Sequence, residues 1–248
     1  MVVSHADLYL RGAETLVVSW EEYARGARDA AVLRVPGVAV AVFPDGPERS
    51  VYNNALLERD LMEPERADAL DAMEAAYAAA GVSHFAAWVH ESDKAMHREL
   101  ERRGYTLEES TRAMGMALDD VCLPQPEIEL APAGWSDYLR FLERLGGPPG
   151  LLIGTDPTAF NVLVARVAGE IVAAAIALDV GGDCGIYNVG TLEHARRRGL
   201  GTALTALHVR RAVSRGCRTA TLQATEMAER IYADVGFRDL GRILEYAP

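Results

Sequence analysis

The sequence lacks the features of a membrane-spanning, secreted or metal-binding protein. It has no run of about 18 or more apolar residues, so we expect no membrane-spanning helix. Its first residues, MVVSHADLYLRGAE, lack the basic segment and apolar stretch of a secretion signal. The three cysteines, Cys122, Cys184 and Cys217, are odd in number and lack metal-ligand spacing. We therefore interpret them as reduced thiols and predict a cytoplasmic protein without a metal site.

Positive charge is also scarce, and it is unevenly placed. The chain has 25 basic and 36 acidic residues, for a formal charge of −11, and Lys94 is its single lysine. Residues 1–125 hold 12 basic against 22 acidic residues, whereas residues 126–248 hold 13 against 14. A chain this acidic lacks the basic surface that sequence-independent nucleic-acid binding needs, so we expect no nucleic-acid partner. The acidic half is either a solvated face or a surface that attracts a cationic acceptor.

Two segments rich in proline and glycine divide the 248 residues. The segments are Asp119–Pro126 (DDVCLPQP) and Gly146–Gly150 (GGPPG). Length alone allows one large domain or two of about 120 residues. We place the domain boundary near residue 125, which predicts domains at residues 1–125 and 126–248.

The second half alternates between strand and helix patterns. Leu200, Leu204 and Leu207 have the spacing of one buried helical stripe, and Gly216 follows as a C-cap. The pattern predicts a helix over Trp135–Leu145, strands over Asn161–Val167, Glu170–Val180 and Cys184–Leu192, a helix over Gly199–Arg215, a strand over Thr219–Gln223, a helix over Met227–Val235 and a final strand from Arg238. This order predicts an α/β domain.

The first half repeats the end of this pattern. Gly104-Tyr105 and Gly236-Phe237 each follow a short predicted helix and precede a strand. Upstream, a predicted helix over Glu65–Ala80 ends at Gly81, as the helix of the second half ends at Gly216, and strand His84–Val89 follows. We interpret the repeat as a divergent duplication.

One loop of the second half has the composition of an anion-binding site. A predicted strand runs into the loop Arg196–Thr202 (RRRGLGT), which opens a helix. Glycines let backbone N–H groups approach an anion, and a helix N-terminus adds unsatisfied donors and positive partial charge. A pyrophosphate fits such a site. There is no GK[ST], which excludes a nucleotide-hydrolysing P-loop, and the spacing is not the GxGxxG of a dinucleotide site.

Arg196-x-x-Gly199-x-Gly201, between a strand and a helix, resembles the [RQ]xxGx[GA] motif of the GCN5-related N-acetyltransferases (GNATs). The strand TATLQAT and a helix with Tyr232 just before Gly236-Phe237 follow at the family's interval. The resemblance covers about residues 127–248 and implies a mixed, mostly antiparallel central sheet flanked by helices. With the repeat, it implies two tandem GNAT-like domains, of which the N-terminal copy is degenerate.

The resemblance implies an N-acetyltransferase that transfers acetyl from acetyl-CoA, its co-substrate, to a primary amine by direct attack through a tetrahedral intermediate. Pantetheine would lie in a splay between two strands, and a backbone N–H near Val189 or Gly190 would stabilise the oxyanion. Tyr232 would protonate the thiolate. The residues implied to bind the cofactor are Val189, Gly190, Thr191, Arg196, Arg197, Arg198, Gly199, Leu200, Gly201, Thr202, Thr225 and Tyr232.

Several roles stay open at this stage. Glu193 is a candidate general base where many relatives have proline, with His194 or a water chain as alternatives. Thr225 either bonds pantetheine or caps the helix that follows it. The acceptor is a small-molecule amine or a protein N-terminus.

The N-terminal copy lacks the glycine pair and has Leu100 in place of Tyr232, so we expect it to complete the acceptor cleft or to form a homodimer surface. Two other classes of function remain. One is a coenzyme A-binding regulatory module without turnover, and the other is an interaction protein in which the glycine loop is only a turn.

Overall fold

The computed structural model describes residues 3–46, 52–119, 128–147 and 149–248. In these residues, hydrogen bonding orders eleven strands as β1-β2-β3-β4-β11-β5-β10-β9-β8-β7-β6. The fold is α+β with a mixed, mostly antiparallel sheet, so the predicted fold class is confirmed. Within the described residues, no helix is long and apolar enough to cross a membrane.

The chain forms two compact units, and each unit draws on more than one stretch of sequence. Unit 1 comprises Met1–Leu16 and Ala113–Leu240, and unit 2 comprises Val17–Arg112 and Gly241–Pro248. The divisions fall within α1 (His5–Gly26), β5 (Thr106–Ala117) and β11 (Arg238–Ala247). The predicted boundary at residue 125 lies outside the described residues, and the division into residues 1–125 and 126–248 stays a prediction.

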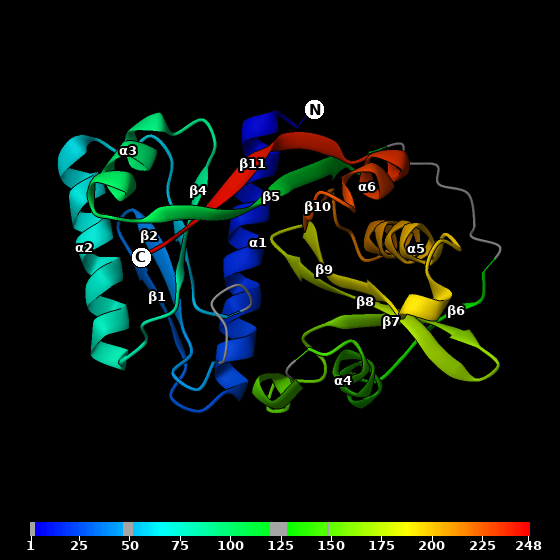
Figure 1. The fold of residues 1–248 in the computed structure, drawn as a ribbon. Helices are drawn as coiled ribbons and strands as arrows, with labels where there is room; N and C mark the ends of the chain where they lie inside the picture. Colours follow the sequence, from blue (N-terminus) through cyan, green and yellow to red (C-terminus); the bar gives the residue numbers. More distant parts are fainter. Residues whose placement is uncertain (1–2, 47–51, 120–127, 148) are drawn as a thin grey trace. The chain divides into compact units, whose positions relative to one another are not determined.

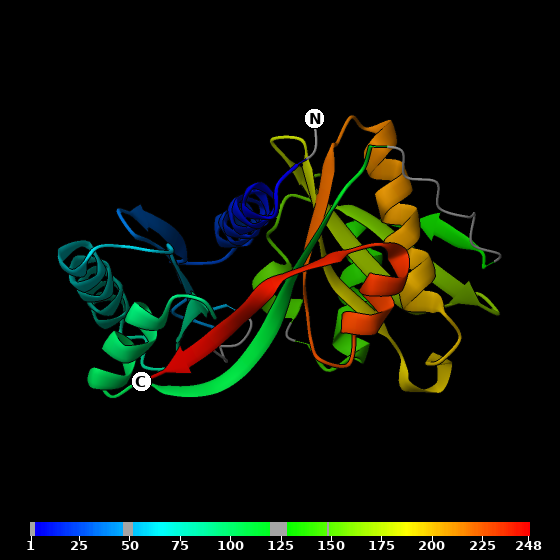
Figure 2. The same ribbon diagram turned by 90° about the horizontal axis from the view of Figure 1, so that it is seen from above.

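Unit 1 contains most of the elements predicted for the second half of the chain. These predicted elements are α4 (Trp135–Arg144), β7 (Asn161–Val167), β8 (Glu170–Val180), β9 (Asp183–Thr191), α5 (Leu200–Ser214), β10 (Thr219–Ala224) and α6 (Glu229–Val235). The unit also contains β6 (Leu130–Pro132) and the 3₁₀ turns η1 (Pro149–Leu152) and η2 (Glu193–Ala195), which the sequence pattern does not predict. Figure 1 shows α5 and α6 on one side of this unit's strands and α4 on the other, and Figure 2 shows α5 lying across the strands.

The core of unit 1 follows from the apolar faces of β8 and α5. Alternate residues of β8, including Ala173 and Ala175, are fully buried and pack with Leu200 and Leu204 of α5. The predicted stripe on α5 therefore faces the sheet. Small side chains on β8 let α5 pack closely against the sheet. This packing holds the start of α5 in place relative to the strands of unit 1.

Unit 2 is built from β1 (Ala31–Val35), β2 (Val38–Val42), β3 (Asn54–Leu57), α2 (Glu63–Ala80), β4 (Ala86–His90) and α3 (Lys94–Arg102), with the last part of β11 paired to β4. Its core joins α2 and α3 to one face of the strands, with Leu70, Met73 and Leu100 fully buried.

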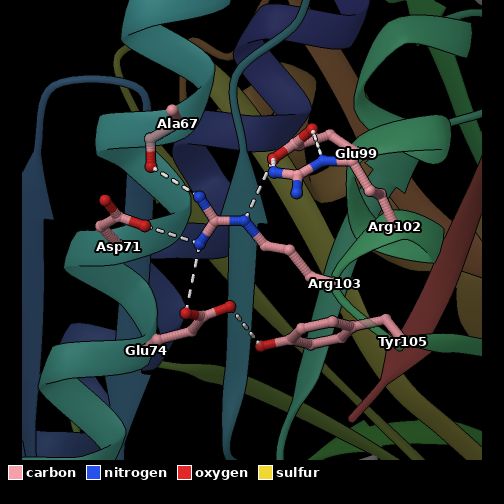
Figure 3. Close-up of polar contacts among 7 residues, drawn as sticks. All are labelled: Ala67, Asp71, Glu74, Glu99, Arg102, Arg103 and Tyr105. Atoms are coloured by element: carbon pink, nitrogen blue, oxygen red, sulfur yellow. Dashed lines mark hydrogen bonds and ion pairs between the residues drawn. The ribbon is translucent and has the colours of Figure 1, made fainter.

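An arginine also links α2 to the end of α3. The Arg103 guanidinium lies 2.6 Å from an Asp71 oxygen and 3.2 Å from oxygens of Glu74 and Glu99 (Figure 3). Its side chain is 16% exposed, so these contacts form in a partly desolvated place. Three carboxylates around one guanidinium hold the two helices together more firmly than an exposed ion pair would.

The two units share an arrangement of elements that is consistent with the duplication that the sequence predicts. In unit 2, β3 pairs in parallel with β4 and α2 connects them; in unit 1, β9 pairs in parallel with β10 and α5 connects them. The helix ends match as well. Tyr105 N donates to Leu100 O at 3.0 Å, and Phe237 N donates to Tyr232 O at the same distance. Gly104 and Gly236 have φ of 93° and 115°, which glycine adopts without strain.

Candidate functional site

β9 and β10 run side by side over only part of their length. Thr219, Ala220 and Thr221 pair with Asp183, Cys184 and Gly185, while β9 continues to Thr191 and β10 to Ala224. Among these described residues, no further pair joins the two strands. A gap opens between two strands where their ladder stops, and the free backbone groups lining it are suited to bind a ligand through hydrogen bonds. Val189, Gly190 and Thr191 lie on the part of β9 that does not pair with β10.

A β-bulge interrupts the same part of β9. Tyr187 pairs with Ile176 and Gly190 pairs with Ala174, so Asn188 and Val189 both lie opposite Ala175. Asn188 has φ of 52°, and its Nδ2 donates to the hydroxyl of Tyr138 on α4 at 2.8 Å. A bulge leaves the ladder locally disrupted and re-aims backbone groups. The sequence gives little indication of this bulge, because the residues Asn188-Val189-Gly190 resemble an ordinary strand end.

The loop after β9 presents a row of free backbone donors. η2 ends at Ala195, Arg197 has φ of 63°, and Gly199 has φ of 74° just before α5. In the described part of the chain, the N–H groups of residues 197–202 donate to no protein acceptor, and the first donation after them is from Ala203 to Gly199 O at 2.9 Å. Alternating right- and left-handed residues before a helix form a concave nest of N–H groups that binds anions.

The three loop arginines are exposed and keep their charge available. Arg196 Nε donates to Thr191 O at 3.3 Å, which ties the loop to the end of β9. Within the described residues, none of Arg196, Arg197 and Arg198 forms an ion pair with a carboxylate. Their charge therefore adds to the positive end of the α5 dipole.

Gly201 leaves open the space that a side chain would fill. A Cβ at this position would contact Val189 Cγ1 at 3.7 Å and no other atom within 4 Å. Gly201 also lies in the first turn of α5 with ordinary backbone angles, so packing alone does not require glycine there. The nest, the charge and this open space suit an anionic group such as a phosphate. Leu200 is buried and Thr202 is half-buried in the same first turn.

Tyr232 lies on α6, and its side chain is largely buried. It is 7% exposed and meets Phe237 edge to face, with ring centroids 6.2 Å apart. Burial raises the pKa of Tyr232 to about 12, so the phenol keeps its proton near neutral pH. Val189 of β9 packs against the same cluster, which places Tyr232 and the unpaired end of β9 in one neighbourhood.

Thr225 and Glu193 lie at the edges of this neighbourhood. Thr225 is exposed, and its carbonyl accepts from Ala228 N at 2.8 Å. The prediction that Thr225 caps the following helix is wrong, because α6 begins at Glu229 with Ala228 at its N-cap and no side-chain cap. Glu193 and His194 are both exposed on η2, directly after β9.

Comparison with known proteins agrees with this geometry. Residues 158–239 match the model of the acetyltransferase (GNAT) domain family. The match includes the arginine-glycine loop and Tyr232. No curated protein sequence matches the chain.

Solved structures are similar to almost the whole chain. A GCN5-related N-acetyltransferase from Kribbella flavida has 19% identity and a TM-score of 0.71 over 95% of this chain and 94% of its own. One from Sphaerobacter thermophilus has 18% identity and a TM-score of 0.59 over 94% and 90%. A glucosamine N-acetyltransferase region of a fungal multi-domain GH3 beta-N-acetylglucosaminidase has 15% identity and a TM-score of 0.60 over 84% and 31%. These similarities show a shared fold, which is consistent with two tandem copies.

Proposed function

We propose that this protein is an N-acetyltransferase that transfers the acetyl group of acetyl-CoA to a primary amine. The observation that supports this most strongly is the row of backbone N–H groups at residues 197–202 that donate to no acceptor among the described residues. Open space at Gly201 and three arginines that form no ion pair with a described carboxylate lie in the same loop. This arrangement suits a pyrophosphate, and the interrupted ladder of β9 next to it suits the pantetheine arm. The cytoplasm is the compartment we propose for it.

The reaction follows from these positions. The neutral amine attacks the thioester carbonyl carbon, and the N–H of Val189 or Gly190 at the bulge stabilises the oxyanion of the tetrahedral intermediate. The carbon–sulfur bond then breaks, and the departing thiolate takes the proton of the Tyr232 hydroxyl. The amine's proton leaves to Glu193 or to water. Coenzyme A and the amide are the products.

The acceptor is the least defined part of the proposal. The fungal region that shares this fold acts, by its name, on glucosamine. A panel of amino sugars, polyamines, amino acids and peptide N-termini therefore covers the acceptors to test, with release of the free thiol as the signal. We further propose that the N-terminal copy serves as a scaffold that completes the acceptor cleft or supports a homodimer.

The test of the cofactor site compares acetyl-CoA binding in three proteins. Gly201→Glu puts a carboxylate into the proposed nest, so we expect it to abolish binding. Gly150→Glu is the matched control, because Gly150 has ordinary backbone angles and no atom within 4 Å of its Cβ position. At about a hundred times Kd, acetyl-CoA should stabilise wild type and Gly150→Glu by about 2.7 kcal/mol in a thermal shift.

The outcomes separate the classes of function. Unchanged binding by Gly201→Glu would refute the placement of the pyrophosphate. Binding by wild type without thiol release for any amine would favour a coenzyme A-binding module without turnover.

A further inference from the structure

One hydrogen bond on each side of the strands of unit 1 holds the bulge of β9. On the α4 side, Asn188 Nδ2 donates to the Tyr138 hydroxyl at 2.8 Å. On the α5 side, His208 Nε2 lies 3.2 Å from the carbonyl oxygen of Ala175, the β8 residue opposite the bulge. Figure 1 shows α4 and α5 on opposite sides of these strands. The bulge is therefore held directly from α4, and the β8 residue opposite it is held from α5.

The contact on the α4 side acts on an unusual backbone conformation. Asn188 has φ of 52°, a region that asparagine visits more readily than most other non-glycine residues. Without a hydrogen bond from its side chain, Asn188 at this exposed position would leave the peptide planes on either side of it free to rotate. The bond to Tyr138, whose ring is fully buried, anchors the conformation to α4.

The contact on the α5 side involves a histidine that is fully buried. His208 is 0% exposed, and its Nδ1 has no hydrogen-bond partner among the described residues. Because a carbonyl can only accept, Nε2 carries the proton and Nδ1 is left with a lone pair in an apolar place. Burying an unsatisfied polar atom is costly, whereas leucine would fill similar space without that cost. The polar contact that His208 makes within the described residues is the one from its Nε2 to the carbonyl oxygen of Ala175.

His208 also connects the bulge to the proposed cofactor site. It lies on α5, two turns after Gly201 in the helix that begins with the nest of N–H groups. A rigid helix therefore joins the anion site at its first turn to the strand position opposite the bulge. Moving α5 relative to β8 would change the distance between the bound pyrophosphate and the N–H groups of the bulge.

We infer that His208 and the Asn188–Tyr138 pair are positioning residues that aim the N–H of Val189 or Gly190 at the thioester oxygen. This inference rests on the proposed function. None of these three side chains needs to touch acetyl-CoA. Their effect is on the direction of a backbone donor, and a misplacement of about 1 Å in a catalytic group costs about a hundredfold in rate.

The experiment observes the thioester carbonyl directly, so it needs no acceptor. Acetyl-CoA labelled with ¹³C at the carbonyl is bound to the protein, and a hydrogen bond to its oxygen moves the ¹³C resonance downfield. We compare wild type, His208→Leu, His208→Gln and Tyr138→Phe, and measure the Kd of each for acetyl-CoA. His208→Gln retains an N–H donor and serves as the conservative rescue.

A matched control separates positioning from burial of any histidine. His97 in unit 2 is also buried, and its Nε2 lies 3.1 Å from His90 O. We expect His97→Leu to leave the carbonyl resonance and Kd unchanged. We expect His208→Leu and Tyr138→Phe to keep Kd within about twofold, lose most of the downfield move and lower kcat for any accepted amine by about tenfold or more.

Each result has a distinct meaning. A wild-type protein that does not bind acetyl-CoA overturns the proposed function, and the inference falls with it. A wild-type protein that binds without a downfield move leaves the cofactor site standing but removes the oxyanion donor, which overturns the inference. If both His208→Leu and Tyr138→Phe keep the full downfield shift, the inference is overturned and the proposed function still stands.

Discussion

Tyr232 is buried among apolar side chains, yet it ends in a hydroxyl. Because burial raises its pKa to about 12, the phenol is protonated near neutral pH. We expect Tyr232→Phe to lower kcat by about a hundredfold, the usual range for loss of a general acid, with the Kd for acetyl-CoA unchanged. Steady-state kinetics with the best amine of the panel measures the first quantity, and calorimetry measures the second.

A second buried tyrosine provides the control for this substitution. Tyr77 is fully buried in unit 2, and its hydroxyl donates to Ala41 O at 3.1 Å. Tyr77→Phe should reduce stability and leave kcat unaltered, since it removes a hydroxyl outside unit 1. An unaffected kcat in Tyr232→Phe would mean that Tyr232 only fills the core.

Single residues of the loop were readable from the sequence because their chemistry is local. Arginine and glycine before a helix predict an anion site from backbone geometry alone, and Gly199 adopts the left-handed conformation that such a loop needs. Asn188 was missed because its positive φ is imposed by pairing with β8 and by Tyr138, which lies 50 residues earlier. Of the two roles left open for Thr225, the helix cap is wrong because the chain makes a turn there before α6 begins.

At the scale of an element, α5 combines a proposed binding role with a buried titratable group. The pKa of His208 is lowered to about 4, chiefly by burial and also by the charges of Arg215 and Arg211, while the bond to Ala175 and the charge of Asp179 act in the opposite direction. The folded state therefore holds His208 neutral at pH values where an unfolded chain would protonate it. This contribution to stability is full above pH 6.5 and is lost as pH falls towards 4.

We expect the free energy of unfolding of wild type, relative to His208→Gln, to fall by roughly 2 kcal/mol between pH 7 and pH 4.5. Urea denaturation of both proteins over this range measures the difference, and the comparison cancels the titration of other groups. A difference that does not change with pH would show that His208 titrates normally and is reached by water in the folded state.

Elements of the second half were predicted well because their apolar residues recur with a clear helical or strand period. The strands over Asn161–Val167 and Glu170–Val180 agree with β7 and β8, and α4 and α5 are each within one or two residues of their predicted ranges. The long helix α1 went unpredicted. Its apolar residues Leu8, Leu16 and Trp20 are buried. The start signal is Ser4, whose hydroxyl accepts from Asp7 N at 3.1 Å while the Asp7 carboxylate accepts from Ser4 N at 3.3 Å.

At the scale of the whole molecule, the compact units do not follow the linear order of the chain. Unit 2 ends with the last residues of the sequence, because Ile243 to Tyr246 pair with His90 to Ala87. Such a pairing joins residues about 150 positions apart, and no local pattern reports it. The repeat in the sequence predicts two similar sets of elements, but it does not show which unit receives the final strand.

The two units also differ at the start of the helix that connects their parallel strands. α5 begins with free N–H groups and arginines, whereas α2 begins with Glu63 and Glu65. The Glu65 carboxylate accepts from Met62 N at 2.9 Å, so it occupies the place an anion would take. Two carboxylates in the first turn complement the helix dipole and repel a phosphate.

We therefore expect one acetyl-CoA per chain, although the two units have similar sets of elements. Isothermal titration calorimetry should give a stoichiometry of one in wild type and no binding in Gly201→Glu. Glu65→Gln is the informative companion: it removes one charge from the start of α2, but that helix still lacks a glycine pair, so the stoichiometry should stay at one. Two sites in wild type, or residual binding by Gly201→Glu with a separate Kd, would show that the N-terminal copy has kept a cofactor site and is not a scaffold.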